Sequence, residues 1–211
     1  MRSLFALALT LALAAPPAAA GDLAVQVRAD NGKPVADAVV TLHLADRPTP
    51  LPHPGGRYHV DQRDVQFQPF VLVVPVNSDV AFPNFDPIRH HVYSFSPAKR
   101  FELKLYAREQ SHHVHFDKPG VVALGCNIHD QMTAFLNVVD TPWAGKTDAS
   151  GQVVLHGAPA GAVTVAVWHP YLRAPGNRLE RSLTLAATGT QGQTFTVSLR
   201  PPPPPMGGAP Y

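Results

Sequence analysis

The sequence predicts an all-β fold of the sandwich type, on three observations. Gly and Pro are frequent, with 15 and 23 of the 211 residues. No long stretch shows helical i, i+3, i+4, i+7 apolar periodicity without such breakers. Short alternating or β-branched runs recur instead, separated by turn residues. We expect strands at residues 23–27, 38–42, 71–76, 121–124, 135–139, 152–155, 163–167 and 194–199.

The two ends of the chain predict segments outside the folded part. Residues 1–20 resemble a signal peptide, because Arg2 precedes an apolar run at 4–15 and small residues then lead to a cleavage point near Ala20. The alternative is a membrane anchor. No later run is apolar for long enough to span a membrane, so we expect a periplasmic or secreted mature chain. Residues 201–211 open with five prolines and predict a Pro-rich, disordered tail.

Charge and cysteine content narrow the function classes. Lys and Arg number 17 against 15 Asp and Glu, with no basic stripe, which argues against a nucleic-acid partner. Cys126 is the single cysteine, so no intramolecular disulfide can form. In an oxidising compartment such a cysteine is a liability unless it is buried, reactive or metal-bound.

A short motif around this cysteine indicates a metal site. Cys126, His129 and Met132 follow the spacing Cys-x-x-His-x-x-Met, between the apolar runs VVALG and MTAFLNVV. One tight loop at a strand end can therefore bring a thiolate, an imidazole and a thioether to the same metal ion. Blue-copper sites use two His and one Cys in a plane, with a weak axial Met. The loop supplies three of these four ligands.

The fourth ligand is expected from a distant histidine pair. His90 and His91 open a strand in the segment DPIRHHVYSF. Successive side chains of a strand face opposite ways, so only one of the two should point at the metal.

Residues 65–140 resemble a cupredoxin of the plastocyanin type, and are most similar to cupredoxin-like proteins named for methylamine utilisation. The resemblance lies in FQPFVLVVPVNSDVAFPNFDPIRHHVYSFS and FDKPGVVALGCNIHDQMTAFLNVVDTP. It implies a Greek-key β-sandwich holding one type 1 copper ion through His90, Cys126, His129 and Met132. His91 stands where the family has an Asn that ties the ligand loops together, which leaves His91 as the alternative ligand. Amides near Asn127 and Asn84 are expected to tune the site.

The flanking segments resemble the small Ig-like sandwich of carboxypeptidase-regulatory-type domains. Gly32 to Val39 match that family's opening strand, and Thr147 to Val165 match its continuation. Neither piece alone has enough strands to bury a core. We therefore expect a discontinuous sandwich at 21–48 and 142–200, with a cupredoxin domain inserted at 49–141. The alternative is two sequential sandwich units.

The resemblance implies a periplasmic one-electron carrier rather than an enzyme, with a redox partner protein and a possible link to amine oxidation. Electrons would pass through the exposed edge of His129. One alternative is a copper-binding carrier or assembly factor without a redox partner. Another makes the flanking sandwich a docking part, with the cupredoxin as a sensor or anchor.

Other interpretations of the same residues stay open. Cys126 could be an inert buried thiol, or a nucleophile with His129 as base and Asp130 as orienting residue. His113 and His115 share a face of a predicted strand near His112, and form either a weak surface metal site or a solvated strand. Asp86, beside the first ligand, is interpreted as a residue that shapes the loop.

Overall fold

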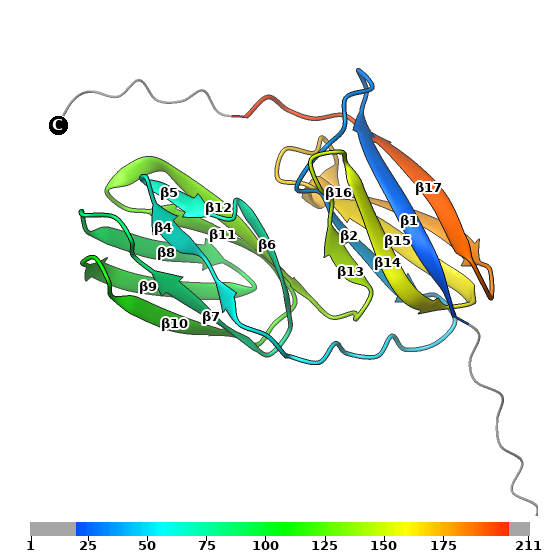
Figure 1. The fold of residues 1–211 in the computed structure, drawn as a ribbon, viewed down its shortest axis with the longest axis horizontal. Coiled ribbons are helices and arrows are strands. Elements are labelled where there is room, and N and C mark those ends of the chain that lie inside the picture. Colours follow the sequence, from blue (N-terminus) through cyan, green and yellow to red (C-terminus); the bar gives the residue numbers. More distant parts are fainter. Residues whose placement is uncertain (1–19, 203–211) are drawn as a thin grey trace, which may run out of the picture.

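The computed structural model describes residues 20–202 and is all-β, as the sequence predicted. The predicted signal peptide at 1–20 lies almost wholly outside these residues, as does the tail beyond Pro202. Within the described part, no helix is long and apolar enough to cross a membrane. Figure 1 shows two bodies of strands side by side, with β3 to β12 in one and β1, β2 and β13 to β17 in the other.

The flanking body contains strands from both ends of the chain. A three-stranded sheet has the order β14-β1-β17, and a four-stranded sheet has the order β13-β2-β15-β16. A single turn of 3-10 helix precedes β16. The strands are β1 (Ala20–Ala29), β2 (Val39–Leu44), β13 (Ala144–Lys146), β14 (Gln152–Pro159), β15 (Gly161–Trp168), β16 (Arg178–Leu185) and β17 (Thr190–Val197).

The inner body is a continuous piece of chain. It contains a five-stranded sheet in the order β6-β12-β11-β8-β9, a three-stranded sheet in the order β10-β7-β3, and the hairpin β4-β5. The strands are β3 (Tyr58–His59), β4 (Asp61–Arg63), β5 (Gln66–Gln68), β6 (Val71–Pro75), β7 (Ser78–Pro83), β8 (His90–Ser96), β9 (Lys99–Tyr106), β10 (Ser111–Phe116), β11 (Gly120–Cys126) and β12 (His129–Val139).

Each body has its own hydrophobic core. In β1, Leu23, Val25 and Val27 are buried and alternate with more exposed residues, so one face of the strand packs inward. Together with β2, β14, β15 and β17 they enclose one cluster, whereas a second cluster lies wholly between Val60 and Val138. We therefore propose that the inner body is a domain inserted at 49–141 into a discontinuous flanking sandwich. The resemblance of that sandwich to an Ig-like domain stays a prediction.

A small aromatic cluster joins the two bodies. Trp168 of β15 packs with Val39 and Val71, and its ring lies 5.8 Å from that of Phe135 on β12. Phe70, just before β6, lies 5.6 Å from Phe135 and 6.1 Å from Tyr171, measured between ring centroids. These contacts hold the inserted part against the flanking sandwich.

The eight strands expected from short apolar runs are present, and so are the strands expected at His90 and around His113 and His115. The structure adds strands that local patterning did not reveal, mainly β3 to β5 and β9. β9 nevertheless carries the alternation Phe101, Leu103 and Leu105, of which Phe101 and Leu103 pack against the core, so this strand could have been expected from the sequence. The short strands β3 to β5 form through pairing with neighbours rather than through their own composition.

Candidate metal centre

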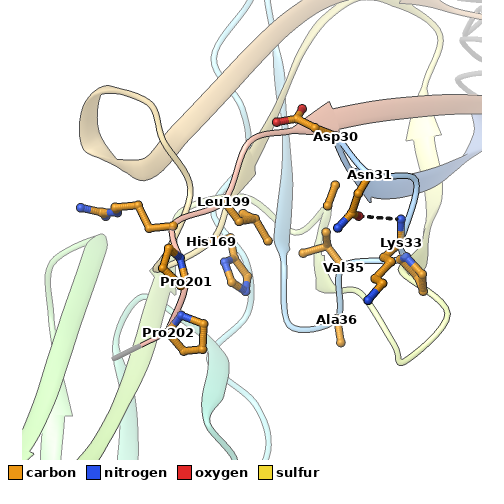
Figure 2. A pocket seen from close by; sticks show the side chains of 12 residues that line it. Asp30, Asn31, Lys33, Val35, Ala36, His169, Leu199, Pro201 and Pro202 are labelled. Carbon is orange, nitrogen blue, oxygen red and sulfur yellow. Dashed lines mark hydrogen bonds between the residues drawn. The ribbon is translucent and has the colours of Figure 1, made fainter. Parts of the chain in front are cut away.

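A pocket of about 600 Å³ opens at one end of the flanking sandwich, away from the cysteine motif. Figure 2 shows its lining, in which His169, Leu199, Pro201 and Pro202 face a turn carrying Lys33. The Nδ1 atom of His169 accepts the Tyr171 amide hydrogen at 3.2 Å. Burial lowers the pKa of His169, so its ring is neutral near pH 7.

The β11–β12 turn positions two of the predicted ligands. Cys126 ends β11 and His129 begins β12, and the register pairs these two residues directly. A register shift between Gly125 and Cys126 turns the end of the strand. As a result the sulfur of Cys126 lies 3.5 Å from Nδ1 of His129.

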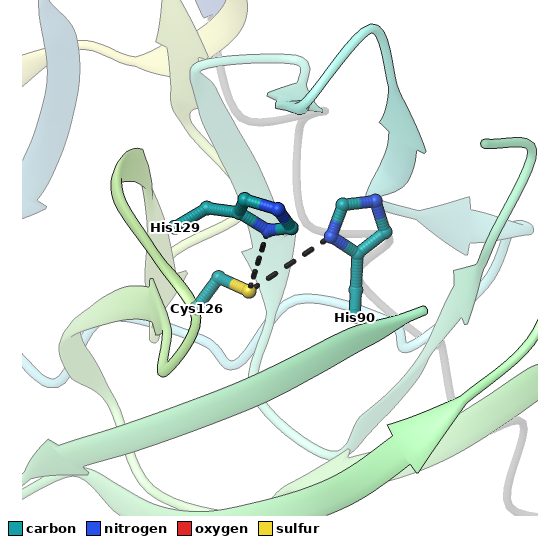
Figure 3. A group of neighbouring side chains, drawn as sticks. All are labelled: His90, Cys126 and His129. Carbon is teal, nitrogen blue, oxygen red and sulfur yellow. Dashed lines mark hydrogen bonds between the residues drawn. The ribbon is translucent and has the colours of Figure 1, made fainter. Parts of the chain in front are cut away.

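His90 approaches the same sulfur from a strand far away in the sequence. It is the first residue of β8, which pairs with β11 so that Cys126 lies opposite Val92. Its Nδ1 atom lies 3.8 Å from the Cys126 sulfur. Figure 3 shows both imidazoles turned toward the sulfur.

The three donors fit a trigonal metal plane. Their ligand atoms all lie within 4.8 Å of one another, and no other such group of three His, Cys, Asp or Glu occurs in residues 20–202. Metal bonds of about 2.3 Å to sulfur and 2.0 Å to nitrogen at 120° would hold these atoms about 3.7 Å apart. The observed sulfur–nitrogen distances of 3.5 and 3.8 Å bracket that spacing. A soft thiolate with two imidazoles is the donor set that copper prefers.

The centre is largely closed to solvent. His90 is fully buried and Cys126 is 3% exposed, whereas His129 is half-buried. Three apolar residues close to the ligands in the sequence are exposed: Phe85 by 40%, and Ile88 and Ile128 by 42% each. The His129 side is therefore the accessible edge of the site.

Asp86 sets the orientation and tautomer of His90. Nε2 of His90 lies 2.7 Å from a carboxylate oxygen of Asp86, and Asp86 is itself buried. A proton on Nε2 that is donated to this carboxylate leaves Nδ1, which faces Cys126, as the nitrogen that would bind a metal. From the sequence alone, Asp86 is expected only to shape the loop. Its position four residues before the ligand was the one available signal.

A hairpin and an asparagine hold Asp86 in place. The amides of Asp64 and Val65, in the β4–β5 turn, donate to its two carboxylate oxygens at 2.6 and 3.0 Å. Oδ1 of Asn84 accepts the Asp86 amide hydrogen at 2.9 Å, and its Nδ2 donates to the carbonyl of Ile88 at 2.9 Å. Burial alone would raise the pKa of Asp86, but these amides and His90 outweigh it and lower that pKa.

His91 points elsewhere. Its Nε2 atom lies 3.0 Å from a carboxylate oxygen of Glu102 on β9. Its carbonyl accepts the Asn127 amide hydrogen at 3.2 Å, so backbone atoms tie the two ligand loops together. His90, rather than His91, is therefore the histidine brought to Cys126.

The surroundings favour a thiolate at Cys126. Burial raises the pKa of the thiol, but hydrogen bonds from His90, from the amides of His91 and Ile128, and from His129 outweigh it and lower the pKa to about 6. Burial lowers the pKa of His90, and the bonds to Cys126 and Asp86 outweigh it and raise that pKa. Without metal, the site thus holds a thiolate beside an imidazole that favours its proton.

Met132 is placed in the same core as the cysteine. It lies on β12, is 1% exposed, and belongs to the buried cluster that contains Cys126 and Val92. Burial of this residue agrees with an axial ligand and with a core side chain alike, so its ligand role stays a prediction.

Comparison with known proteins finds similar chains among the solved structures. No family model matches the chain, and the curated proteins contain no match. Among solved structures, a Cu(I) amicyanin variant is 20% identical with a TM-score of 0.37, and the match covers 47% of this chain and 98% of amicyanin. The purple cupredoxin of Nitrosopumilus maritimus is 18% identical with a TM-score of 0.36, covering 39% and 99%.

The similar structures are cupredoxins, as the resemblance in the sequence predicted. The copper-containing nitrite reductase of Thermus scotoductus is 24% identical with a TM-score of 0.38. Its match covers 44% of this chain and only 23% of the reductase, so this chain spans less than a quarter of that protein. The chemistry of the site in this chain follows from its own residues.

Proposed function

We propose that this protein is an exported type 1 copper protein that carries single electrons. One observation supports this most directly: a buried thiolate-prone cysteine lies 3.5 and 3.8 Å from the ring nitrogens of two histidines. The copper ligands in this proposal are His90, Cys126 and His129 in a plane, with Met132 as the weaker axial donor.

The residues of the chain prepare this site before metal arrives. The lowered pKa of Cys126 supplies a thiolate near neutral pH. Asp86 fixes the ring of His90, and the backbone bond from Asn127 to His91 holds the two ligand loops together. Copper bound there would supply one-electron chemistry between Cu(II) and Cu(I). A rigid ligand set that suits both oxidation states keeps rearrangement small.

We further propose that electrons pass through the half-buried edge of His129. Phe85, Ile88 and Ile128, which are close to the ligands in the sequence, have exposed side chains that would offer an apolar surface to a redox partner protein. The export signal expected at residues 1–20 supports a periplasmic or secreted location. In such an oxidising compartment, a bound metal protects the thiolate of the single cysteine from disulfide exchange. The resemblance in the sequence suggests an amine-oxidising pathway as its setting.

Adding Cu(II) to the mature protein tests the proposal. We expect an intense thiolate-to-copper absorption band and an EPR spectrum with narrow copper hyperfine splitting. Cys126→Ser should abolish the band, whereas His156→Ala, at an exposed histidine of the flanking sandwich, should leave it unchanged. A wild-type protein that binds Cu(II) without this band would refute the type 1 assignment.

A second variant tests the axial ligand separately. Met132→Leu keeps a side chain of similar volume in the core, so the fold should persist. We expect copper to stay bound and the reduction potential to shift, because the axial donor tunes the potential. An unchanged spectrum and an unchanged potential would show that Met132 is core only.

A further inference from the structure

The three-stranded sheet β10-β7-β3 has an outer face rich in histidine. On its inner face, Val80, Val114 and Phe116 are buried in the core. Side chains alternate along strands, so the residues between these point outward. His113 and His115 of β10 and His59 of β3 are accordingly exposed. Figure 1 shows β7 and β10 along the lower edge of the inner body.

The strand register gathers these histidines. His113 lies opposite Ala81 of β7, and His59 lies opposite the same Ala81 on the other side. The small alanine leaves room between the two imidazoles. His115 is two residues from His113 on the same face and lies opposite Asp79. Three histidines therefore lie near one another on the outer face of this sheet.

Carboxylates already orient two of these rings. Nδ1 of His115 lies 3.0 Å from an oxygen of Asp79, and Nδ1 of His59 lies 2.9 Å from an oxygen of Asp61. A neutral imidazole that donates its Nδ1 proton to a carboxylate presents the Nε2 lone pair outward. Metal-ligating histidines are commonly held in this way.

The side chains of this face are mobile enough to close on an ion. The side chains of His59 and His115 are 56% and 50% exposed, so their χ angles can change without disturbing the core. Residues two apart on a strand are separated by about 7 Å at Cα, which is within the reach of two imidazoles toward a shared ion. In the structure the imidazole nitrogens of these histidines are not yet close enough to share an ion. Within residues 20–202, only the group of His90, Cys126 and His129 has its ligand atoms within 4.8 Å of one another.

We propose that this face is a second metal site, which binds a divalent transition-metal ion through His113 and His115, with His59 as a third ligand. Imidazole donors suit Cu(II), Ni(II) and Zn(II), and the Irving–Williams order makes Cu(II) the tightest. The site is open, lacks sulfur and lies on the face of the sheet opposite the core. It is therefore distinct from the Cys126 centre and does not depend on the proposed electron transfer.

Metal titration of the full-length protein, without a polyhistidine tag, tests the proposal. We expect the wild type to bind a second equivalent of Cu(II) that adds no thiolate band and gives a tetragonal EPR signal with nitrogen coupling. His113→Ala/His115→Ala should lose this second equivalent and retain the first. The matched control, His53→Ala/His156→Ala, removes two exposed histidines elsewhere and should retain both.

Further variants separate this site from the copper centre. Cys126→Ser should remove the thiolate band yet keep the tetragonal signal. Asp79→Asn should weaken the second site by about tenfold or more, because it removes the carboxylate that orients His115. The proposal is wrong if no second equivalent binds, if it survives His113→Ala/His115→Ala, or if the control loses it equally. Circular dichroism of each variant shows whether the fold is retained.

Discussion

At the scale of single residues, Asp86 connects the metal centre to the rest of the inner body. Its carboxylate accepts hydrogen bonds from His90 and from the two backbone amides of the β4–β5 turn. Each contact satisfies a buried polar group that would otherwise be unpaired. The orientation of a copper ligand thus depends on a hairpin that never touches the metal.

Asp86→Asn tests this connection. The amide lacks the negative charge that stabilises Cu(II) through His90, so the reduction potential should rise and the copper affinity should fall about tenfold. Voltammetry and a competition titration measure the two effects. Asp46→Asn, which changes an exposed carboxylate that pairs only with Arg47, is the matched control. A potential that falls or stays constant in Asp86→Asn would contradict the role given to this carboxylate.

Titration of Cys126 gives a second prediction at this scale. In the metal-free protein the thiol should deprotonate with a midpoint at about pH 6, below the ordinary cysteine pKa of about 8.5. Protons should therefore compete with copper for the sulfur only below about pH 6. Ultraviolet thiolate absorbance measures the midpoint, with Cys126→Ser as the blank. A midpoint near 8.5 would show that the surrounding donors do not stabilise the thiolate.

At the scale of elements, the β4–β5 hairpin serves the site through its turn. Asp64 and Val65 have φ angles of 55° and 56°, and Arg63 pairs with Gln66 across the two-residue turn. Positive φ at both turn positions is the geometry of a type I′ hairpin. A β-branched residue is strained there, yet this geometry directs both amides at Asp86.

Val65→Gly should relieve the strain and keep the amide. Left-handed backbone costs an L-residue roughly 1–2 kcal/mol, and the greater freedom of glycine in the unfolded chain offsets part of that. The free energy of unfolding in urea should thus rise by about 0.5–1 kcal/mol, with an unchanged copper spectrum. Val154→Gly, at an exposed valine in the regular strand β14, should instead lower it. Equal destabilisation by both would argue against strain at Val65.

At the scale of the whole molecule, two hydrophobic cores meet at one aromatic cluster. Trp168, Phe135 and Phe70 bridge the flanking sandwich and the inserted part. The inserted part is also joined to the rest at both of its ends, because β2 and β13 pair with each other on either side of it. These links should make the two bodies unfold together.

Trp168→Ala tests the coupling between the bodies. Removing a ring that is 7% exposed should lower stability by about 3 kcal/mol. Calorimetry should then resolve two transitions, of which copper raises only the one from the inner body. Trp143→Ala is the control, because Trp143 packs on the flanking core without joining the aromatic cluster. One unsplit transition in Trp168→Ala would mean that other contacts couple the bodies.

Local pattern was enough to predict the all-β class, ten of the strands and the approach of His129 to Cys126, whereas the ligand role of Met132 stays a prediction. The reason is that alternation along a strand and ligand spacing within one loop both act over a few residues. Such patterns can therefore be recognised in a short segment without knowledge of the rest of the fold.

Contacts between distant segments were decided by folding. Strand register decides three features: the choice of His90 over His91, the hydrogen bond between Asp86 and His90, and the placing of His59 and His113 on either side of Ala81. A shift of one residue in register turns every side chain of a strand to the opposite face. The packing of both cores selects that register, and no short stretch of sequence encodes the selection.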